Sequence, residues 1–172
     1  AKAGLRPFVA IYSTFLARGF DQVMYDIGLH GLPVVICIDR AGITGPDGAS
    51  HHGVHDIAMY ARVPGMTILS PSSLQELPIM LNQALAIEDG PVAIRWPRGN
   101  AAESDDVGRG MDARLVHEGT DVAILAAGKM LTAANSAVSL LAEEGVQAEL
   151  WDPRVLKPCL LYTSPSPRDV LR

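Results

Sequence analysis

Short apolar runs alternate along this chain with stretches whose apolar residues recur at helical spacing, and this alternation restricts the fold more than any other feature. Apolar runs of this length are typical of buried strands, and we expect strands over residues 8–12, 34–38, 66–69 and 92–96. In the segments between these runs, the helical spacing of the apolar residues and the residues that can cap a helix predict helices over residues 13–30, 55–61 and 73–88. Such alternation favours an α/β fold with an open, mostly parallel sheet and helices on both of its faces.

A change of composition near residue 99 predicts a division of the chain. Residues 99–112 are rich in glycine and acidic residues, which is typical of a linker. One further strand, helix and strand are expected over 122–126, 130–144 and 147–152. A single strand-helix-strand unit is too small to bury the apolar faces of its own elements. We therefore predict a first domain over 1–98, a linker over 99–112 and the truncated start of a second domain over 113–158. Residues 159–172 lose this pattern and are rich in Ser and Pro, so we interpret them as a non-native tail.

The second predicted strand leads into a loop, DRAGITGPDGASHHGVHD over residues 39–56, whose composition suits a functional site better than a core. It contains four glycines, three histidines, three acids and one arginine. Glycine permits close approach of a ligand to the backbone, and histidine and aspartate can move protons near neutral pH. Because the carboxyl ends of parallel strands form one ligand-binding edge, we expect this loop to meet the loops at 12–18 and 95–100.

The histidines and arginines of these loops leave alternatives open. His51, His52 and His55 could be metal ligands, solvated loop residues or groups that contact a substrate; the metal interpretation is weak because no ligand-spacing motif is present. Their place at the end of a strand favours contact with a substrate. Arg40 and Arg98 follow two different strands and could either bind one phosphate through forked hydrogen bonds or form surface ion pairs.

Tyr12 and Phe15 are two of nine aromatic residues, and both lie at one predicted strand-to-helix turn, with Arg18 about one helical turn further on. Phe15 is either a core residue or a surface on which a flat heterocycle stacks. The chain has no GxGxxG, GxxxxGK[ST] or GxSxG motif, which argues against a Rossmann dinucleotide site, a P-loop and a serine hydrolase.

Composition narrows the class of protein further. The net charge of -5 argues against a broad nucleic-acid surface, and no apolar run approaches the length of a membrane span. Hydrophobic residues form 48% and charged residues 19% of the chain, as in globular domains with a core. The two cysteines, Cys37 and Cys159, give no disulfide framework, which suits a reducing compartment.

Four segments together resemble the pyrimidine-binding domain of the 1-deoxy-D-xylulose-5-phosphate synthase family, in the transketolase superfamily. They are YSTFLARGFDQ, PVVICIDRAGITGPDGASHHGVHD, MTILSPSS and GPVAIRWPRGN. The resemblance covers about residues 5–158 and implies that Phe15 stacks on the aminopyrimidine ring of thiamine diphosphate, with Tyr12 and Arg18 beside it. By the same resemblance this family is bacterial and cytoplasmic, with a plastid as the alternative, and homodimeric.

The resemblance also implies an activity. The family condenses pyruvate with glyceraldehyde 3-phosphate to give 1-deoxy-D-xylulose 5-phosphate and carbon dioxide, for isoprenoid precursor, thiamine and pyridoxal biosynthesis. Arg40 and Arg98 match the residues that bind the aldehyde's phosphate, and Asp47 and His51 match those that assist proton transfer. Two alternatives are another transketolase-type enzyme and a non-catalytic dimerisation or binding module of the same fold.

The chain departs from the family in parts that the reaction needs. The glutamate that activates the aminopyrimidine lies upstream of YSTF in the superfamily, and here no glutamate precedes Glu76. The family's GDG-containing domain, which binds Mg²⁺ and the diphosphate, has no counterpart in this sequence. We therefore assign no metal ligand within the chain and expect the chain to be inactive by itself.

Overall fold

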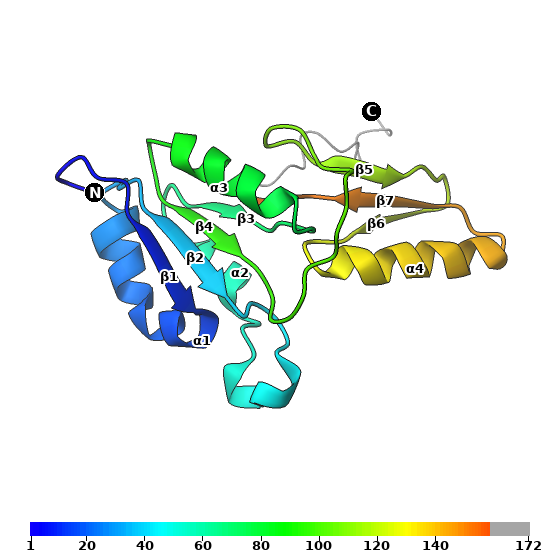
Figure 1. The fold of residues 1–172 in the computed structure, drawn as a ribbon, viewed down its shortest axis with the longest axis horizontal. Helices are drawn as coiled ribbons and strands as arrows, with labels where there is room; N and C mark the ends of the chain where they lie inside the picture. The colour runs from blue at the N-terminus through cyan, green and yellow to red at the C-terminus, as the bar shows by residue number, and fades with distance from the viewer. Residues whose placement is uncertain (159–172) are drawn as a thin grey trace.

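The computed structural model describes residues 1–158, which form two β-sheets with helices packed against them (Figure 1). The first sheet has the strand order β1-β2-β4-β3-β8, and the second has the order β5-β7-β6. The strands of the first sheet are β1 (Phe8–Tyr12), β2 (Val35–Asp39), β3 (Thr67–Leu69), β4 (Val92–Arg95) and β8 (Val155–Lys157). Those of the second are β5 (Arg114–His117), β6 (Val122–Leu125) and β7 (Ala148–Asp152).

Four α-helices and several tighter or wider helical turns connect these strands. The α-helices are α1 (Ser13–Leu16), α2 (Asp56–Tyr60), α3 (Glu76–Ala86) and α4 (Met130–Glu143). Strands β1, β2, β4 and β3 run parallel to one another, and β8 is antiparallel to β3. The expected α/β fold with a mostly parallel sheet is therefore confirmed. No helix within residues 1–158 is both long and apolar enough to cross a membrane.

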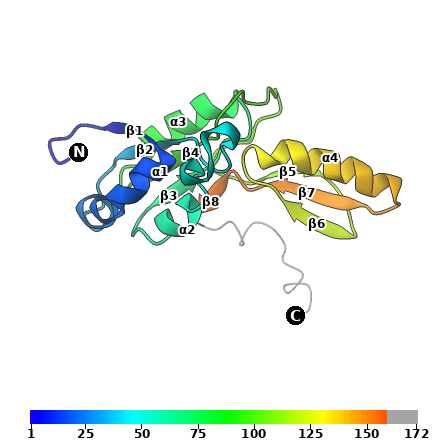
Figure 2. The ribbon, with the colours of Figure 1, turned by 90° about the horizontal axis from the view of Figure 1, so that it is seen from below.

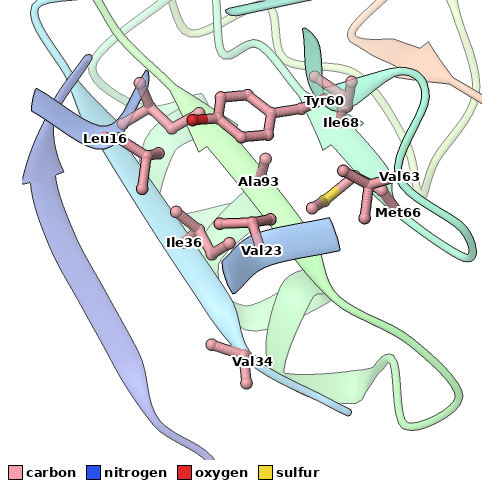
Figure 3. Close-up of a cluster of buried hydrophobic side chains, with 10 residues drawn as sticks. Leu16, Val23, Val34, Ile36, Tyr60, Val63, Met66, Ile68 and Ala93 are labelled. Atoms are coloured by element: carbon pink, nitrogen blue, oxygen red, sulfur yellow. The ribbon is translucent and has the colours of Figure 1, made fainter. Parts of the chain in front are cut away.

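Strand β2 explains why the first sheet needs helices on both faces. Ile36 and Ile38 are fully buried in a cluster with Leu16 and Val23 on one face (Figure 3). The neighbouring residues of β2 belong to a second buried cluster with Met80 of α3 on the other face. Because successive side chains of a strand point to opposite faces, a continuous apolar run must be covered on both sides.

The single helix expected over residues 13–30 is divided into three parts, so this prediction was wrong in detail. After α1 come a 3-10 turn (Ala17–Gly19) and a π-helical segment (Gln22–Gly28), in which the Leu29 N–H donates to the Met24 carbonyl at 2.9 Å. The wider turn brings the backbone of Gly28 against Val63, where a β-carbon would overlap the Val63 side chain. Close packing on Val63 therefore accompanies the departure from α-helical geometry.

Two short strands were missed by sequence reasoning. Strand β5 pairs antiparallel with β7, and β8 pairs antiparallel with β3. The two sheets lie side by side (Figure 2). After β7 of the second sheet, the chain returns to the first sheet and adds β8 to its edge. The proposal that residues 159–172 are a non-native tail lies outside the residues that the structure describes.

A fully buried ion pair joins α3 to the turn between β7 and β8. Nε of Arg154 lies 2.7 Å from Oε1 of Glu76, and both side chains have 0% exposure. Glu76 also accepts hydrogen bonds from the backbone N–H groups of Ser72 and Gly108, at 3.1 and 3.0 Å. Burial opposes ionisation of Glu76, but these N–H groups and the Arg154 guanidinium together lower the pKa of Glu76. Ser73 Oγ accepts the Glu76 N–H at 3.2 Å and so caps the first turn of α3.

Candidate active site

The parallel pairing of three neighbouring strands brings three loops to one edge of the first sheet. Tyr12 is the last residue of β1 and pairs in register with Asp39, the last residue of β2. Strand β2 in turn pairs with β4, which ends at Arg95. The turn after Tyr12, the loop 39–56 and the segment 95–100 therefore meet, as the sequence predicted.

Asp47 lies at the centre of this edge and contacts two of the three loops. The hydroxyl group of Tyr12 donates a hydrogen bond of 3.0 Å to Oδ2 of Asp47. Nη1 of Arg98 lies 3.2 Å from Oδ1 of Asp47 and also donates to the Thr44 carbonyl at 3.3 Å. Both carboxylate oxygens therefore have a partner, and Asp47 connects the end of β1 to the segment after β4.

Three rings pack around this carboxylate. The ring centroids of Tyr12 and Phe15 are 5.0 Å apart, and His51 lies 5.6 Å from Tyr12 and 6.1 Å from Phe15, edge-on to both. Phe15 is 49% exposed, so the interpretation as a core residue was wrong. Desolvation and the hydrogen bond to Asp47 raise the pKa of Tyr12 above its usual value. The cluster thus combines an open aromatic surface with groups that can exchange protons.

Arg40 is held over the same cluster by a strained backbone and two neighbours. Its φ angle is +57°, in the left-handed region that non-glycine residues rarely adopt. Its guanidinium carbon lies 5.0 Å from the centroid of the Tyr12 ring, a cation–π contact. Asp39 forms an ion pair with the Arg40 side chain and accepts the Arg40 backbone N–H at 2.8 Å. The indole N–H of Trp96 donates to Asp39 at 3.1 Å and fixes that carboxylate.

Most of the residues singled out in the sequence are brought together here, and Arg18 is not. Arg18 lies on the 3-10 turn after α1, and its side chain forms no hydrogen bond or ion pair with any of residues 1–158. The residues that converge on the edge of the sheet are Tyr12, Phe15, Arg40, Asp47, His51 and Arg98.

His51 and His52 take different positions. His51 faces the two aromatic rings, and its Nδ1 lies 3.0 Å from Ser50 Oγ. Nδ1 of His52 accepts the Thr44 backbone N–H at 3.1 Å and therefore holds the loop in shape. Within residues 1–158 no group of three or more His, Cys, Asp or Glu side chains could hold a metal ion. The geometry thus gives His51 a place at the edge and His52 a structural one.

A buried polar cluster beneath the edge escaped sequence reasoning. Ser13 Oγ donates to Oδ1 of Asp56 at 2.7 Å, and Nη2 of Arg95 lies 3.7 Å from Oδ2 of Asp56. Burial raises the pKa of Asp56, although the Ser13 hydroxyl and the Arg95 guanidinium act in the opposite direction. Gly53 packs so tightly on Ser13 that a β-carbon there would overlap the Ser13 side chain. These contacts join the loop 39–56 and the start of α2 to the first residue of α1 and to the end of β4.

The fold and the edge residues together define a transketolase-type α/β unit. The sequence matches the family "Transketolase, pyrimidine binding domain" over residues 1–103 and the family "Transketolase, C-terminal domain" over residues 111–161. Since the first match spans more than half of the chain, the chain belongs to the transketolase pyrimidine-binding domain family.

Curated relatives make the resemblance more specific. The chain is 48% identical over 166 residues to the 1-deoxy-D-xylulose-5-phosphate synthase of Chlorobium phaeovibrioides, and 45% identical over 163 residues to that of Thermomicrobium roseum. Each match covers 92% of this chain and 26% of the relative. The resemblance to this synthase is therefore confirmed, and the chain spans about a quarter of the length of these relatives.

Solved structures agree on the fold. A protein described as "Split gene transketolase, inactive beta4 tetramer" superimposes with a TM-score of 0.84 at 32% identity, covering 95% of this chain and 55% of the other. The transketolase of Pichia stipitis in complex with sedoheptulose 7-phosphate gives a TM-score of 0.80 at 17% identity, covering 95% and 25%. At the lower identity, the likeness concerns the fold alone.

Proposed function

We propose that this chain forms part of a thiamine-diphosphate-dependent enzyme that condenses pyruvate with D-glyceraldehyde 3-phosphate, giving 1-deoxy-D-xylulose 5-phosphate and carbon dioxide. The observation that carries the proposal is the convergence of an exposed aromatic ring, a doubly hydrogen-bonded carboxylate and two guanidinium groups at one edge of the sheet. The names of the similar synthases support the choice of this reaction over others of the same fold.

The residues present fit the ring portion of the cofactor. Phe15 exposes half of its surface next to Tyr12 and His51, which leaves an apolar face for a planar heterocycle. When bound, thiamine diphosphate supplies the carbanion chemistry for decarboxylation and carbon–carbon bond formation. We assign its diphosphate and Mg²⁺ to residues outside this chain, and we place Arg18 near the cofactor only by family resemblance.

Asp47, His51 and Tyr12 are the groups that would hold or move protons. Tyr12 donates to Asp47, so one hydrogen bond links the phenol to the carboxylate at the edge. His51 directs Nδ1 to Ser50, which leaves Nε2 for a hydroxyl or carbonyl oxygen of the substrate. A histidine and a carboxylate on one surface suit the proton transfers that accompany addition to an aldehyde.

Arg40 and Arg98 would bind the phosphate of the aldehyde. Each guanidinium already has a carboxylate partner, Asp39 for Arg40 and Asp47 for Arg98. Both side chains remain about two-fifths exposed, so a phosphate can reach them. Two charge-assisted contacts on one phosphate would position the aldehyde carbon relative to the cofactor.

The test is product analysis with the full-length protein that contains this chain. Purified protein with thiamine diphosphate, Mg²⁺, pyruvate and glyceraldehyde 3-phosphate should give 1-deoxy-D-xylulose 5-phosphate, identified by NMR and mass spectrometry. Turnover of a ketose phosphate donor in place of pyruvate would indicate another transketolase-type enzyme. Binding of neither cofactor nor substrate would indicate a non-catalytic module. The 172-residue chain alone should be inactive, and light scattering on the full-length protein should give the mass of a homodimer.

A further inference from the structure

Strands β5, β6 and β7 and helix α4 form what we call the second unit. Lys129, at the start of α4, lies close to the segment that carries Arg98. A β-carbon built on Gly99 would lie 4.0 Å from Nζ of Lys129, so the ammonium group reaches the residue next to Arg98 in sequence. The position is fixed by Gly128, whose φ angle is +56° and whose β-carbon, if present, would lie 2.6 Å from Ser70 Oγ. Gly128 thus lets the first turn of α4 approach the loop after β3.

A cavity separates the two cations. It has a volume of about 460 Å³ and is lined by Ile43, Thr44, Gly45, Arg98, Gly99 and Lys129. No acidic residue lines this cavity, and Lys129 forms no side-chain hydrogen bond or ion pair within the part of the chain that the structure describes. Arg98, which lines the same cavity, is held by Asp47 and the Thr44 carbonyl. One paired and one unpaired cation therefore face the same space.

We propose that Lys129 supplies a third positive charge to the phosphate site, so that the second unit takes part in binding the phosphorylated substrate. The inference rests on the proposed function, because Arg98 is assigned there to the same phosphate. An ammonium group at the rim of the cavity can contact a phosphate oxygen that the planar guanidinium of Arg98 leaves free. Because Lys129 is exposed, its contribution should be that of one solvated ion pair, about fivefold in affinity.

Binding of inorganic phosphate to the full-length protein that contains this chain tests the inference without any turnover. Phosphate titrations followed by NMR should show that Lys129→Ala weakens binding about fivefold, whereas Lys129→Arg retains it. Lys2→Ala removes the same charge from an exposed lysine outside the cavity and should leave the affinity unchanged. Equal affinity in Lys129→Ala and the unaltered chain, equal weakening in Lys2→Ala, or no phosphate binding at all would each overturn the proposal.

A second measurement separates this inference from the proposed reaction. In the full-length protein, Lys129→Ala should raise KM for glyceraldehyde 3-phosphate about fivefold and leave kcat/KM for unphosphorylated glyceraldehyde unchanged. A product other than 1-deoxy-D-xylulose 5-phosphate would refute the proposed function, while the phosphate titration would still decide on Lys129. A loss of activity with both aldehydes would show that Lys129 acts on folding and not on the phosphate.

Discussion

The hydroxyl group of Tyr12 donates to Oδ2 of Asp47 at 3.0 Å, across 35 residues of sequence. This contact holds the loop 39–56 against the end of β1 and joins a phenol to a carboxylate by one hydrogen bond. Because Asp47 also contacts Arg98, a change at any one of these three residues should alter the charge that the others experience.

The pKa of Tyr12 should therefore depend on Asp47. Desolvation and then the Asp47 carboxylate disfavour a tyrosinate at Tyr12. Asp47→Asn removes the negative charge and should lower the Tyr12 pKa part of the way towards its usual value, while Arg40 and Arg98 continue to favour the tyrosinate. NMR titration of the chain with ¹³C-labelled tyrosine measures this directly. Tyr25, which is 60% exposed, is the internal control and should not shift. An unchanged Tyr12 pKa would mean that the hydrogen bond does not persist in solution.

Arg98→Ala in the full-length protein should mainly weaken capture of the phosphorylated aldehyde. Loss of one charge-assisted hydrogen bond corresponds to about 1.5–3 kcal/mol, or roughly a 10- to 100-fold higher KM for glyceraldehyde 3-phosphate. Steady-state kinetics with Arg62→Ala, an exposed arginine away from the edge, provides the matched control. If KM is the same in both variants, Arg98 does not belong to the phosphate site.

Glu76→Gln should destabilise the chain, because it leaves Arg154 buried without a counter-charge. Breaking a buried ion pair typically costs about 3–5 kcal/mol, and urea unfolding at neutral pH measures this loss. Glu143→Gln, on the exposed face of α4, should change the free energy of unfolding by less than about 0.5 kcal/mol.

The loss in Glu76→Gln should also depend on pH. The pKa of Glu76 is lowered in the folded state, so its stabilising contribution is complete above the unfolded pKa and disappears as pH falls through the folded pKa. The difference between Glu76→Gln and the unaltered chain should therefore shrink in acid. Asp152, whose pKa is raised by burial and also by the Glu76 charge, acts in the opposite direction, and Glu76→Gln removes the second of these contributions. A difference that stays constant down to low pH would contradict an ionised Glu76.

Gly53→Ala should displace the loop 39–56 from the start of α1, since a β-carbon at Gly53 overlaps the Ser13 side chain and lies 2.9 Å from the Arg40 carbonyl. Overpacking of this kind typically costs about 1–3 kcal/mol. In the full-length protein, activity should fall together with thermal stability, measured by circular dichroism. Gly19→Ala is the matched control, because the nearest atom to its β-carbon lies 3.8 Å away. Equal stability of the two variants would show that the loop tolerates the shift.

Local patterns in the sequence were sufficient to predict those parts of the fold that depend on residues close together in the chain. The apolar run before Asp39 predicted β2, and the loop after it predicted the site, because a parallel strand buried on both faces must release its chain at the carboxyl edge. Tyr12 and Phe15 were found because aromatic residues are few in this chain.

Features that depend on contacts between distant segments were not predictable in this way. Nothing near Glu76 in sequence indicates that its partner is Arg154, 78 residues away. Asp39 and Trp96 position Arg40 through contacts between strand ends that the strand pattern does not specify. Strand β8 has three residues and gains its stability from pairing with β3, so its own sequence carries little strand signal.

The return of the chain through β8 also bears on the order in which the protein is made. Strand β3 has three residues and is bordered by β4 on one side and by β8 on the other. On the ribosome, the β3 edge stays unpaired until residues 155–157 emerge, after the whole second unit has been synthesised. An unpaired strand edge can pair with another chain. A nascent chain stalled before Val155 would therefore present an open edge on β3 and could self-associate through it. Pairing of β8 with β3 prevents this self-association.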